Sequence, residues 1–299
     1  MKKIVNTKSL LVLIVLVFAA SVLFAGCASN KNTDGATTTV KTADSSPALK
    51  GSITLSGSTS VQPLTQVLAD AFNEKNPDVK IDVQVGGSST GVKNASTNAS
   101  NIGNSSRELK EEEKGWGLTE YKIAIDGIAV VVNPKNAVVD LTKDQVVKIF
   151  KGEITNWKSV GGADKQIVVV SREAGSGTRG AFEELLPLTG KDDKGNAVSL
   201  VKETLIANEN GVVKATVSSK EDAIGYLSIG YIDKTIKGVK LDSVDATAAN
   251  ILANKYALSR PFLMLTKGEL KPEVKAFLDF ILGDEGQKVV EAEGYIKVK

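Results

Sequence analysis

The sequence lacks the residues on which most enzyme sites depend. Its 299 residues include no histidine, a single cysteine and only 5% aromatic residues. Without histidine there is no Ser-His-Asp or Cys-His relay, and no imidazole that could bind a metal. One cysteine allows no intrachain disulfide, CxxC redox pair or zinc cluster. These absences exclude most hydrolases and metalloenzymes, and we expect neither a metal nor a cofactor.

The charge balance gives no electrostatic reason to expect nucleic acid as a partner. The formal net charge is +2, but Lys2, Lys3 and Lys8 lie in a segment that we expect to be removed. Without these three positive charges the net charge is −1, which favours neither nucleic acid nor bulk attraction to a membrane. The proportions of 42% hydrophobic and 24% charged residues are typical of a globular protein, and the length suggests two compact units.

The first 26 residues have the pattern of a secretory signal peptide. Three lysines precede an unbroken apolar run over 10–20, and small residues follow it. The alternative is an uncleaved membrane anchor, because 9–26 carries no charge and is nearly long enough to span a bilayer. The segment Leu23–Cys27 resembles the bacterial lipoprotein signal. That resemblance implies that Cys27 becomes the first mature residue and carries acyl chains such as palmitate.

The segment after the cysteine is predicted to be a flexible tether. Residues 27–50 are rich in Ser, Thr, Ala, Asn and Lys, with almost no large apolar residue. Such a segment cannot bury enough surface to order itself. We therefore expect the folded part to begin near Gly51 and to run to about Lys299.

Strand and helix patterns alternate through the rest of the chain. Apolar and polar residues alternate over 79–85, as in a half-buried strand, and Thr142 with Gln145 forms a capping box. The alternation indicates an α/β protein with largely parallel sheets. The predicted strands are 53–55, 79–85, 123–132 and 167–170, and the predicted helices are 61–72, about 92–99, 142–150, 181–186, 272–282 and 284–293.

Three strand-to-helix turns are built from Gly, Ser and Thr: 57–60, 86–91 and 171–178. Such turns lie at the carboxyl ends of strands, where open α/β sheets bind ligands. Helix N-termini present N–H groups and a positive dipole end, and hydroxyls add donors. Arg172 adds a guanidinium that could bind an oxyanion with two N–H groups. The turns therefore predict a small anion site.

Two of these turns also match enzyme patterns. Residues 87–91 fit the G-x-S-x-G nucleophile elbow, but Ser89 has no histidine to act as its base. Residues 175–180 fit G-x-G-x-x-G, but a dinucleotide site normally opens the first βαβ unit, and this pattern is in mid-chain. The turns contain no aromatic residue on which a sugar could stack. The remaining alternative is that each is only a tight turn.

Six ordered motifs resemble the phosphate-binding lipoproteins of bacterial high-affinity phosphate ABC importers. The resemblance covers about Gly51 to Lys299. It rests on SGSTSVQPL (56–64), GGSSTGVK (86–93), DGIAVVVNP (126–134), IFKGEITNW (149–157), SREAGSGTR (171–179) and LSRPF (258–262).

The resemblance implies a two-lobed periplasmic-binding-protein-like α/β fold. Two strands form the hinge between the lobes, and the ligand lies in the inter-lobe cleft. Lobe I would comprise 51–133 plus 257–299, and lobe II would comprise 134–256. The chain would cross between lobes near Val132–Asn133 and return near Tyr256–Pro261. Binding would bridge the lobes and close the cleft.

The resemblance also implies which residues bind phosphate. Thr59 and Ser60 belong to the first turn and Ser88 to the second. The third turn would supply the remaining ligands of the set: Arg172, Ser176, Gly177 and Thr178.

One departure from the family concerns the acceptor of the phosphate proton. Some members have an aspartate where this chain has Ser106, and a glycine where this chain has Asp126. Our hypothesis is that Asp126 takes the acceptor role and that Ser106 becomes a neutral contact. A fixed carboxylate would accept the proton of phosphate and repel an unprotonated sulfate oxygen. The alternative is that Asp126 only pairs with Arg172 or caps a turn.

The resemblance thus implies a substrate-binding lipoprotein, not an enzyme, that delivers inorganic phosphate to an ABC importer. It would be an extracytoplasmic monomer, anchored to the cell membrane through Cys27, with the permease subunits as partners. One alternative is a receptor of the same fold for sulfate, molybdate or tungstate. Another is a surface adhesion or signalling lipoprotein that has lost transport.

Overall fold

The computed structural model describes residues 48–189, 200 and 204–299. The predicted signal peptide, Cys27 and most of the predicted tether lie outside these residues. Residues 48–50, at the end of the predicted tether, have no regular secondary structure. In the described part of the chain, no helix is both long enough and apolar enough to cross a membrane.

Lobe I is a sheet with helices on both faces. The strand order is β2-β1-β3-β11-β4, in which β1 is parallel to β2 and β3, and β11 is antiparallel to β3 and β4. Its elements are β1 (Gly51–Gly57), α1 (Gln62–Asn73), β2 (Val79–Val85), α2 (Ser88–Ser96), β3 (Ile102–Ser105), α3 (Glu111–Lys114), the first part of β4 (Leu118–Val132), β11 (Ser259–Lys267), α8 (Pro272–Leu282) and α9 (Asp284–Ala292).

Lobe II continues the same sheet on the far side of β4. The order there is β4-β8-β6-β7, in which β8 is antiparallel to β4, and β6 is parallel to both β7 and β8. Its elements are β5 (Asp140–Leu141), α4 (Lys143–Lys151), η1 (Trp157–Val160), β6 (Val168–Arg172), α5 (Gly177–Leu185), β7 (Leu205–Ala207), α6 (Asn210–Ser219), β8 (Ala223–Ser228), η2 (Ile229–Tyr231), β9 (Lys237–Gly238), β10 (Lys240–Leu241) and α7 (Ala248–Leu252).

The apolar run at the end of β4 is buried on both faces of the sheet. Ile128, Val130 and Val132 point into one core, and Ala129 and Val131 point into the other. Helices α4 and α5 cover the first core and α6 covers the second. A strand covered on both faces loses the alternating pattern of a half-exposed strand, and this explains the continuous apolar run.

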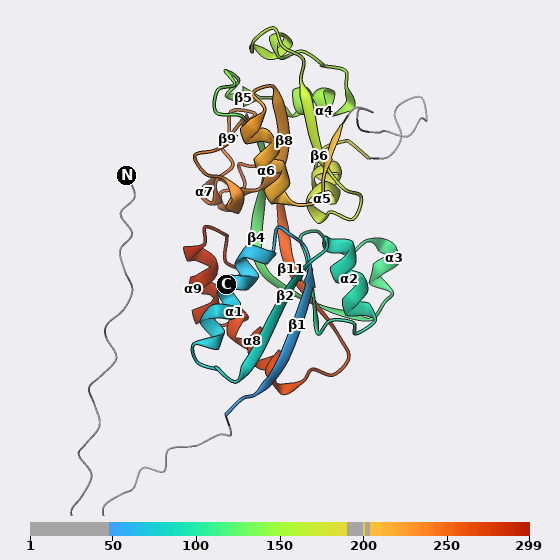
Figure 1. Ribbon diagram of the computed structural model, residues 1–299, viewed down its shortest axis with the longest axis vertical. Coiled ribbons are helices and arrows are strands. Elements are labelled where there is room, and N and C mark those ends of the chain that lie inside the picture. Colours follow the sequence, from blue (N-terminus) through green and yellow to red (C-terminus); the bar gives the residue numbers. More distant parts are fainter. Residues whose placement is uncertain (1–47, 190–199, 201–203) are drawn as a thin grey trace, which may run out of the picture. The chain divides into compact units, whose positions relative to one another are not determined.

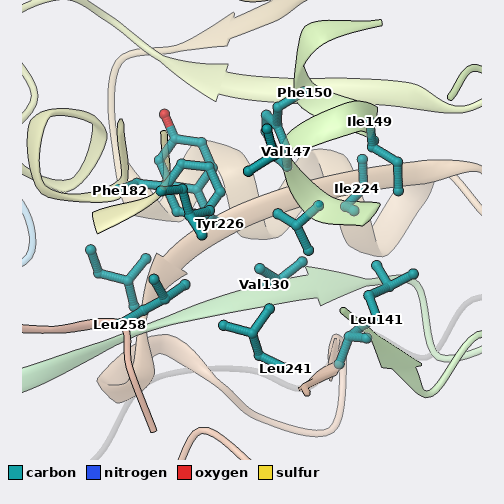
Figure 2. Close-up of a cluster of buried hydrophobic side chains, with 14 of the residues drawn as sticks. Val130, Leu141, Val147, Ile149, Phe150, Phe182, Ile224, Tyr226, Leu241 and Leu258 are labelled. Carbon is teal, nitrogen blue, oxygen red and sulfur yellow. The ribbon is translucent and has the colours of Figure 1, made fainter. Parts of the chain in front are cut away.

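Stacked aromatic rings fix helix α5 on the first of these cores. The ring of Phe182 lies over the ring of Tyr226, with centroids 3.9 Å apart and planes 9° from parallel. Phe150 of α4 meets Phe182 edge to face at 5.0 Å. Figure 2 shows these rings beside the aliphatic side chains of β4 and β8. This packing sets the position of α5, whose first residue, Gly177, follows the third glycine-rich turn.

Two neighbouring segments connect the lobes. Residues 118–127 of β4 pair with β11, and residues 128–132 pair with β8. The partner changes between Gly127 and Ile128, ahead of the Val132–Asn133 crossing that the resemblance implies. The returning segment lies alongside, since Ile128 N donates to Leu258 O and Ser259 is opposite Gly127. Figure 1 shows β4 and β11 together between the two lobes.

The regular elements predicted from the sequence are present, with shifted ends. The prediction of largely parallel sheets is wrong, because β11 and β8 in the middle of the sheet both run antiparallel to β4. The Thr142 capping box is confirmed, because Thr142 Oγ1 accepts from Gln145 N and Gln145 Oε1 accepts from Thr142 N. Helices α2 and α5 both begin about four residues earlier than predicted, within the glycine-rich segments. These segments are therefore helix N-termini as well as turns.

Candidate functional site

The three glycine-rich turns meet where the lobes face each other. Ser60 Oγ in the first turn lies 2.6 Å from Thr178 Oγ1 in the third. Ser89 N, at the start of α2, donates to Gly175 O in the third turn at 3.1 Å. Both contacts join lobe I to lobe II, so the N-termini of α1, α2 and α5 converge on one region.

A cluster of buried hydroxyls lies at the lobe I side of this region. Ser88 Oγ accepts from Ser106 N at 3.0 Å and lies 3.4 Å from Ser106 Oγ. Ser58 Oγ donates to Ser106 Oγ at 2.8 Å. All three residues are buried. Ser106, for which we predict a neutral contact with phosphate, thus has the hydroxyls of Ser58 and Ser88 as neighbours, and its role as a ligand stays a prediction.

Gly177 allows the third turn to approach this cluster closely. A Cβ added to Gly177 would lie 2.6 Å from Ser106 Oγ and nearer still to Ser88 Oγ. Its backbone is in the ordinary helical region, so the requirement for glycine here is space and not a left-handed conformation. The first turn of α5 therefore faces the lobe I hydroxyls directly. Ser176 precedes it as the N-cap, its Oγ accepting from Arg179 N at 3.2 Å.

Arg172 reaches from the end of β6 to the first turn. It is 1% exposed, and its Nη2 donates to Thr59 Oγ1 at 3.2 Å and to Asn208 O at 3.1 Å. Its Nε donates to Ala207 O and to the Glu173 carboxylate, each at 3.1 Å. The guanidinium thus lies between the lobes with a carboxylate and backbone carbonyls behind it.

Asp126 is fully buried and pairs with an arginine that the sequence analysis did not select. Its Oδ2 accepts from Arg260 Nε at 3.0 Å and from Nη2 at 2.8 Å. Its Oδ1 accepts from Ser228 Oγ at 2.8 Å. The alternative that its partner is Arg172 is wrong, since Arg260 forms the ion pair. Burial raises the pKa of the Asp126 carboxyl, and the Arg260 charge and the two partners' hydrogen bonds oppose that shift.

Arg260 contacts two of the predicted ligand residues. Its Nη2 donates to Ser60 Oγ at 3.0 Å, and its Nη1 donates to Ser106 Oγ at 3.3 Å and to Ser106 O at 3.2 Å. It is 3% exposed. The sequence could have indicated Arg260, because it is the third residue of the LSRPF motif on which the resemblance partly rests.

Two residues of lobe II reach the backbone and hydroxyls of the first turn. The amide group of Asn210, the first residue of α6, lies 3.0 Å from Thr59 Oγ1 and 2.8 Å from Ser60 Oγ. With its oxygen facing them it accepts from both hydroxyls and from Arg172 Nη1 at 3.2 Å. Tyr231 Oη donates to Thr59 O at 2.8 Å. The strand-to-helix step from β7 to α6 could have indicated Asn210; nothing in the sequence marks Tyr231.

The site is built from neutral hydroxyls and two charged pairs. Arg172 has Glu173 at 3.1 Å, and Arg260 has Asp126 at 2.8 Å. Among residues 48–189, 200 and 204–299, no group of three His, Cys, Asp or Glu side chains could hold a metal ion. Donor hydroxyls, guanidinium groups and helix N-termini together suit an oxyanion.

Comparison with known proteins gives a consistent family assignment. The model of the PBP superfamily domain matches residues 33–285. The phosphate-binding protein PstS of Bacillus subtilis is 35% identical over 97% of this chain and 95% of its own length. The phosphate-binding protein PstS of Borreliella burgdorferi is 30% identical over 83% of this chain and 90% of its own length.

Solved structures give the same result. A phosphate ABC transporter substrate-binding protein with bound phosphate from Clostridium perfringens has 48% identity and a TM-score of 0.79, covering 83% of this chain and 100% of that one. An ABC-type phosphate transport receptor from Vibrio cholerae has 40% identity and a TM-score of 0.68, with the same coverage. The chain therefore belongs to the PBP superfamily and, within it, to the PstS family of phosphate-binding proteins.

Proposed function

We propose that this protein captures inorganic phosphate outside the cytoplasm and delivers it to an ABC importer. The single observation that carries the proposal is the convergence of three helix N-terminal turns and buried Arg172 from both lobes, within a chain of the PstS family. The family consists of phosphate-binding transport receptors, so no chemical step is required of the site.

The proposed phosphate ligands come from both lobes. In the structure their hydroxyls bond one another, and a tetrahedral anion would accept from the same donors instead. The set is Thr59, Ser60, Ser88, Ser106, Asp126, Arg172, Ser176, Gly177 and Thr178. Two of its members have contacts that bear on their proposed roles. The Ser176 hydroxyl caps α5. Asp126 either accepts the phosphate proton or acts through Arg260, and its hydrogen bonds to Arg260 support the second role.

The proposed lobe division is 51–133 plus 257–299 for lobe I and 134–256 for lobe II. Separate hydrophobic cores support a division of this kind. The change of strand partner between Gly127 and Ile128, together with the packing of 128–132 against α4, α5 and α6, would move the first boundary from 133 back to about 127. Because each lobe supplies part of the ligand set, phosphate would be held only when the cleft is closed.

The proposed attachment to the membrane depends on the N-terminal segment. A signal peptide over 1–26, a lipidated Cys27 and a linker over 27–50 would place the binding domain at the outer surface of the cell membrane. The permease subunits of the importer would be its partners there, and the protein would act as a monomer. Replacing Cys27 with Ser should abolish palmitate labelling of the protein.

Calorimetry of the full chain in mild detergent would test the proposed ligand. We expect saturable binding of phosphate at one site, with sulfate, molybdate and tungstate failing to compete at equal concentration. Preference for one of those anions would support a receptor of the same fold with a different ligand. Absence of binding to all four would refute the proposal and favour an adhesion or signalling role.

A further inference from the structure

Arg260 is held at the crossing between the lobes by the strand opposite it. It lies on β11 directly across from Asp126 on β4, one residue before Gly127, where β4 exchanges β11 for β8 as its partner. The two side chains are almost fully buried. A guanidinium removed from water needs a compensating charge, and the Asp126 carboxylate supplies it through two hydrogen bonds.

The guanidinium is oriented so that its outer end faces the hydroxyl cluster. Nε and Nη2 each donate a hydrogen bond to Asp126 Oδ2. The Nη1 and Nη2 groups also reach Ser106 Oγ and Ser60 Oγ, at 3.3 and 3.0 Å. Both hydroxyls belong to the proposed phosphate ligands. A guanidinium presents planar, parallel donors that match two oxygens of one anion.

The carboxylate of Asp126 is directed at its protein partners on both oxygens. Oδ2 accepts twice from Arg260, and Oδ1 accepts from Ser228 Oγ. Ser228 ends β8 in lobe II, whereas Arg260 belongs to β11. Asp126 is therefore tied to a residue of each lobe, and the group that it presents to the hydroxyl cluster is the guanidinium of Arg260.

We propose that Arg260 is a second phosphate-binding guanidinium beside Arg172, and that Asp126 is a positioning residue that holds it. This inference rests on the proposed function. Two guanidiniums, Arg172 at Thr59 Oγ1 and Arg260 at Ser60 Oγ and Ser106 Oγ, would receive a doubly charged phosphate. The carboxylate keeps Arg260 buried and aligned when the hydroxyls bond one another.

The experiment compares Arg260→Gln, Asp126→Asn and the double variant by phosphate calorimetry on the full chain in mild detergent. We expect Arg260→Gln to weaken phosphate binding by about 10- to 100-fold, as for a lost charge-assisted contact. The double variant separates two causes, since it removes the guanidinium without leaving a buried carboxylate unpaired. We expect it to remain as weak as Arg260→Gln. Recovery of wild-type affinity in the double variant would overturn the inference, because Arg260 would then only neutralise Asp126.

Arg260→Lys tests the geometry with the charge retained. An ammonium is a point charge and lacks the fork, so it should recover only part of the affinity lost in Arg260→Gln. Wild-type affinity in a folded Arg260→Lys protein would refute binding through the Nη pair. This variant keeps a cation beside Asp126, which makes it the safer test if the Gln variant does not fold.

The matched control is the Arg107→Gln/Glu113→Gln double variant. It removes another buried ion pair of lobe I. Arg107 Nη2 also donates to Ser89 Oγ, but none of the hydrogen bonds described for the two side chains reaches a proposed ligand. We expect a lower melting temperature with phosphate affinity unchanged within about twofold. A loss of affinity as large as in Arg260→Gln would overturn the inference by assigning both losses to weakened structure. A wild-type chain that binds no phosphate would instead refute the proposed function.

Discussion

Replacing Gly177 with Ala should weaken phosphate binding without harming either lobe. The Cβ of the new side chain would lie 2.6 Å from Ser106 Oγ and nearer still to Ser88 Oγ, both across the cleft in lobe I. Within lobe II the change is harmless, because Gly177 begins α5 with ordinary helical backbone and alanine favours a helix. The overlap therefore exists only when the lobes are closed together.

The size of the effect follows from the cost of overpacking. Inserting one extra methyl into a close-packed region costs about 1–3 kcal/mol when the surroundings can move by a few tenths of an ångström. Here the whole cost falls on the closed state that holds the ligand. Since each 1.4 kcal/mol is tenfold in affinity, we expect phosphate to bind about 5- to 150-fold more weakly.

Gly175→Ala is the matched control for this experiment. It lies two residues away in the same turn, and its added Cβ would meet Ser89 Cβ at 3.8 Å, which is ordinary van der Waals contact. Calorimetry with phosphate and thermal unfolding without it would be measured on both variants. Equal affinities for Gly177→Ala and the wild type would refute the close approach of α5 to the lobe I hydroxyls. A large fall in melting temperature would contradict the claim that the clash lies only between lobes.

Three further predictions test other parts of the structure. Tyr231→Phe removes the bond from Tyr231 Oη to Thr59 O and should weaken phosphate binding by about 2- to 10-fold in calorimetry; an unchanged affinity would remove this bond from the closed state. Phe182→Ala should lower the free energy of unfolding by about 3–5 kcal/mol in urea titration, since the ring is fully buried on Tyr226; a loss under 1 kcal/mol would contradict that packing. Burial raises the pKa of Glu113, but hydrogen bonds and charge from Arg107 outweigh it and leave the pKa lowered from 4.5. The stability from this pair is therefore present above about pH 4.5 and is lost as pH falls through the lowered pKa, and Glu113→Gln should remove that part of the acid slope in unfolding curves.

The sequence predicted most of the fold because the elements carry local patterns. Alternation over 79–85 and the Thr142 capping box act over a few residues, and the structure has β2 and α4 there. The change of partner within β4 could not be predicted in this way. It depends on β8, whose residues lie 92–100 positions after their partners in β4, and on β11, whose residues lie 132–149 positions after theirs.

The sequence predicted which turns form the candidate site, but it did not predict which charged side chains pair there. Gly, Ser and Thr after a strand are typical of a turn into a helix, and this local pattern was enough to select Ser60, Ser88 and Thr178. The partner of Asp126 is different in kind, because Arg260 is 134 residues away and becomes its neighbour only through strand register. Nothing in the sequence shows whether Arg172 or Arg260 pairs with Asp126. Only the arrangement of the strands decides which of them contacts the carboxylate.

The absence of histidine is consistent with the hydrogen bonds that buried hydroxyls and buried guanidiniums each require. A hydroxyl donates and accepts, so Ser60 and Thr178 can satisfy each other and later donate to an anion. A guanidinium only donates, so each buried arginine needs an acceptor that remains in place, such as Asp126 for Arg260 or the Ala207 carbonyl for Arg172. An imidazole would add a group whose charge changes near neutral pH, where phosphate also titrates. In a site of hydroxyls, charged arginines and their paired carboxylates, the groups whose protonation changes are the anion and Asp126, whose pKa is raised by burial, so the pH dependence of affinity should follow the ionisation of phosphate and of that carboxyl.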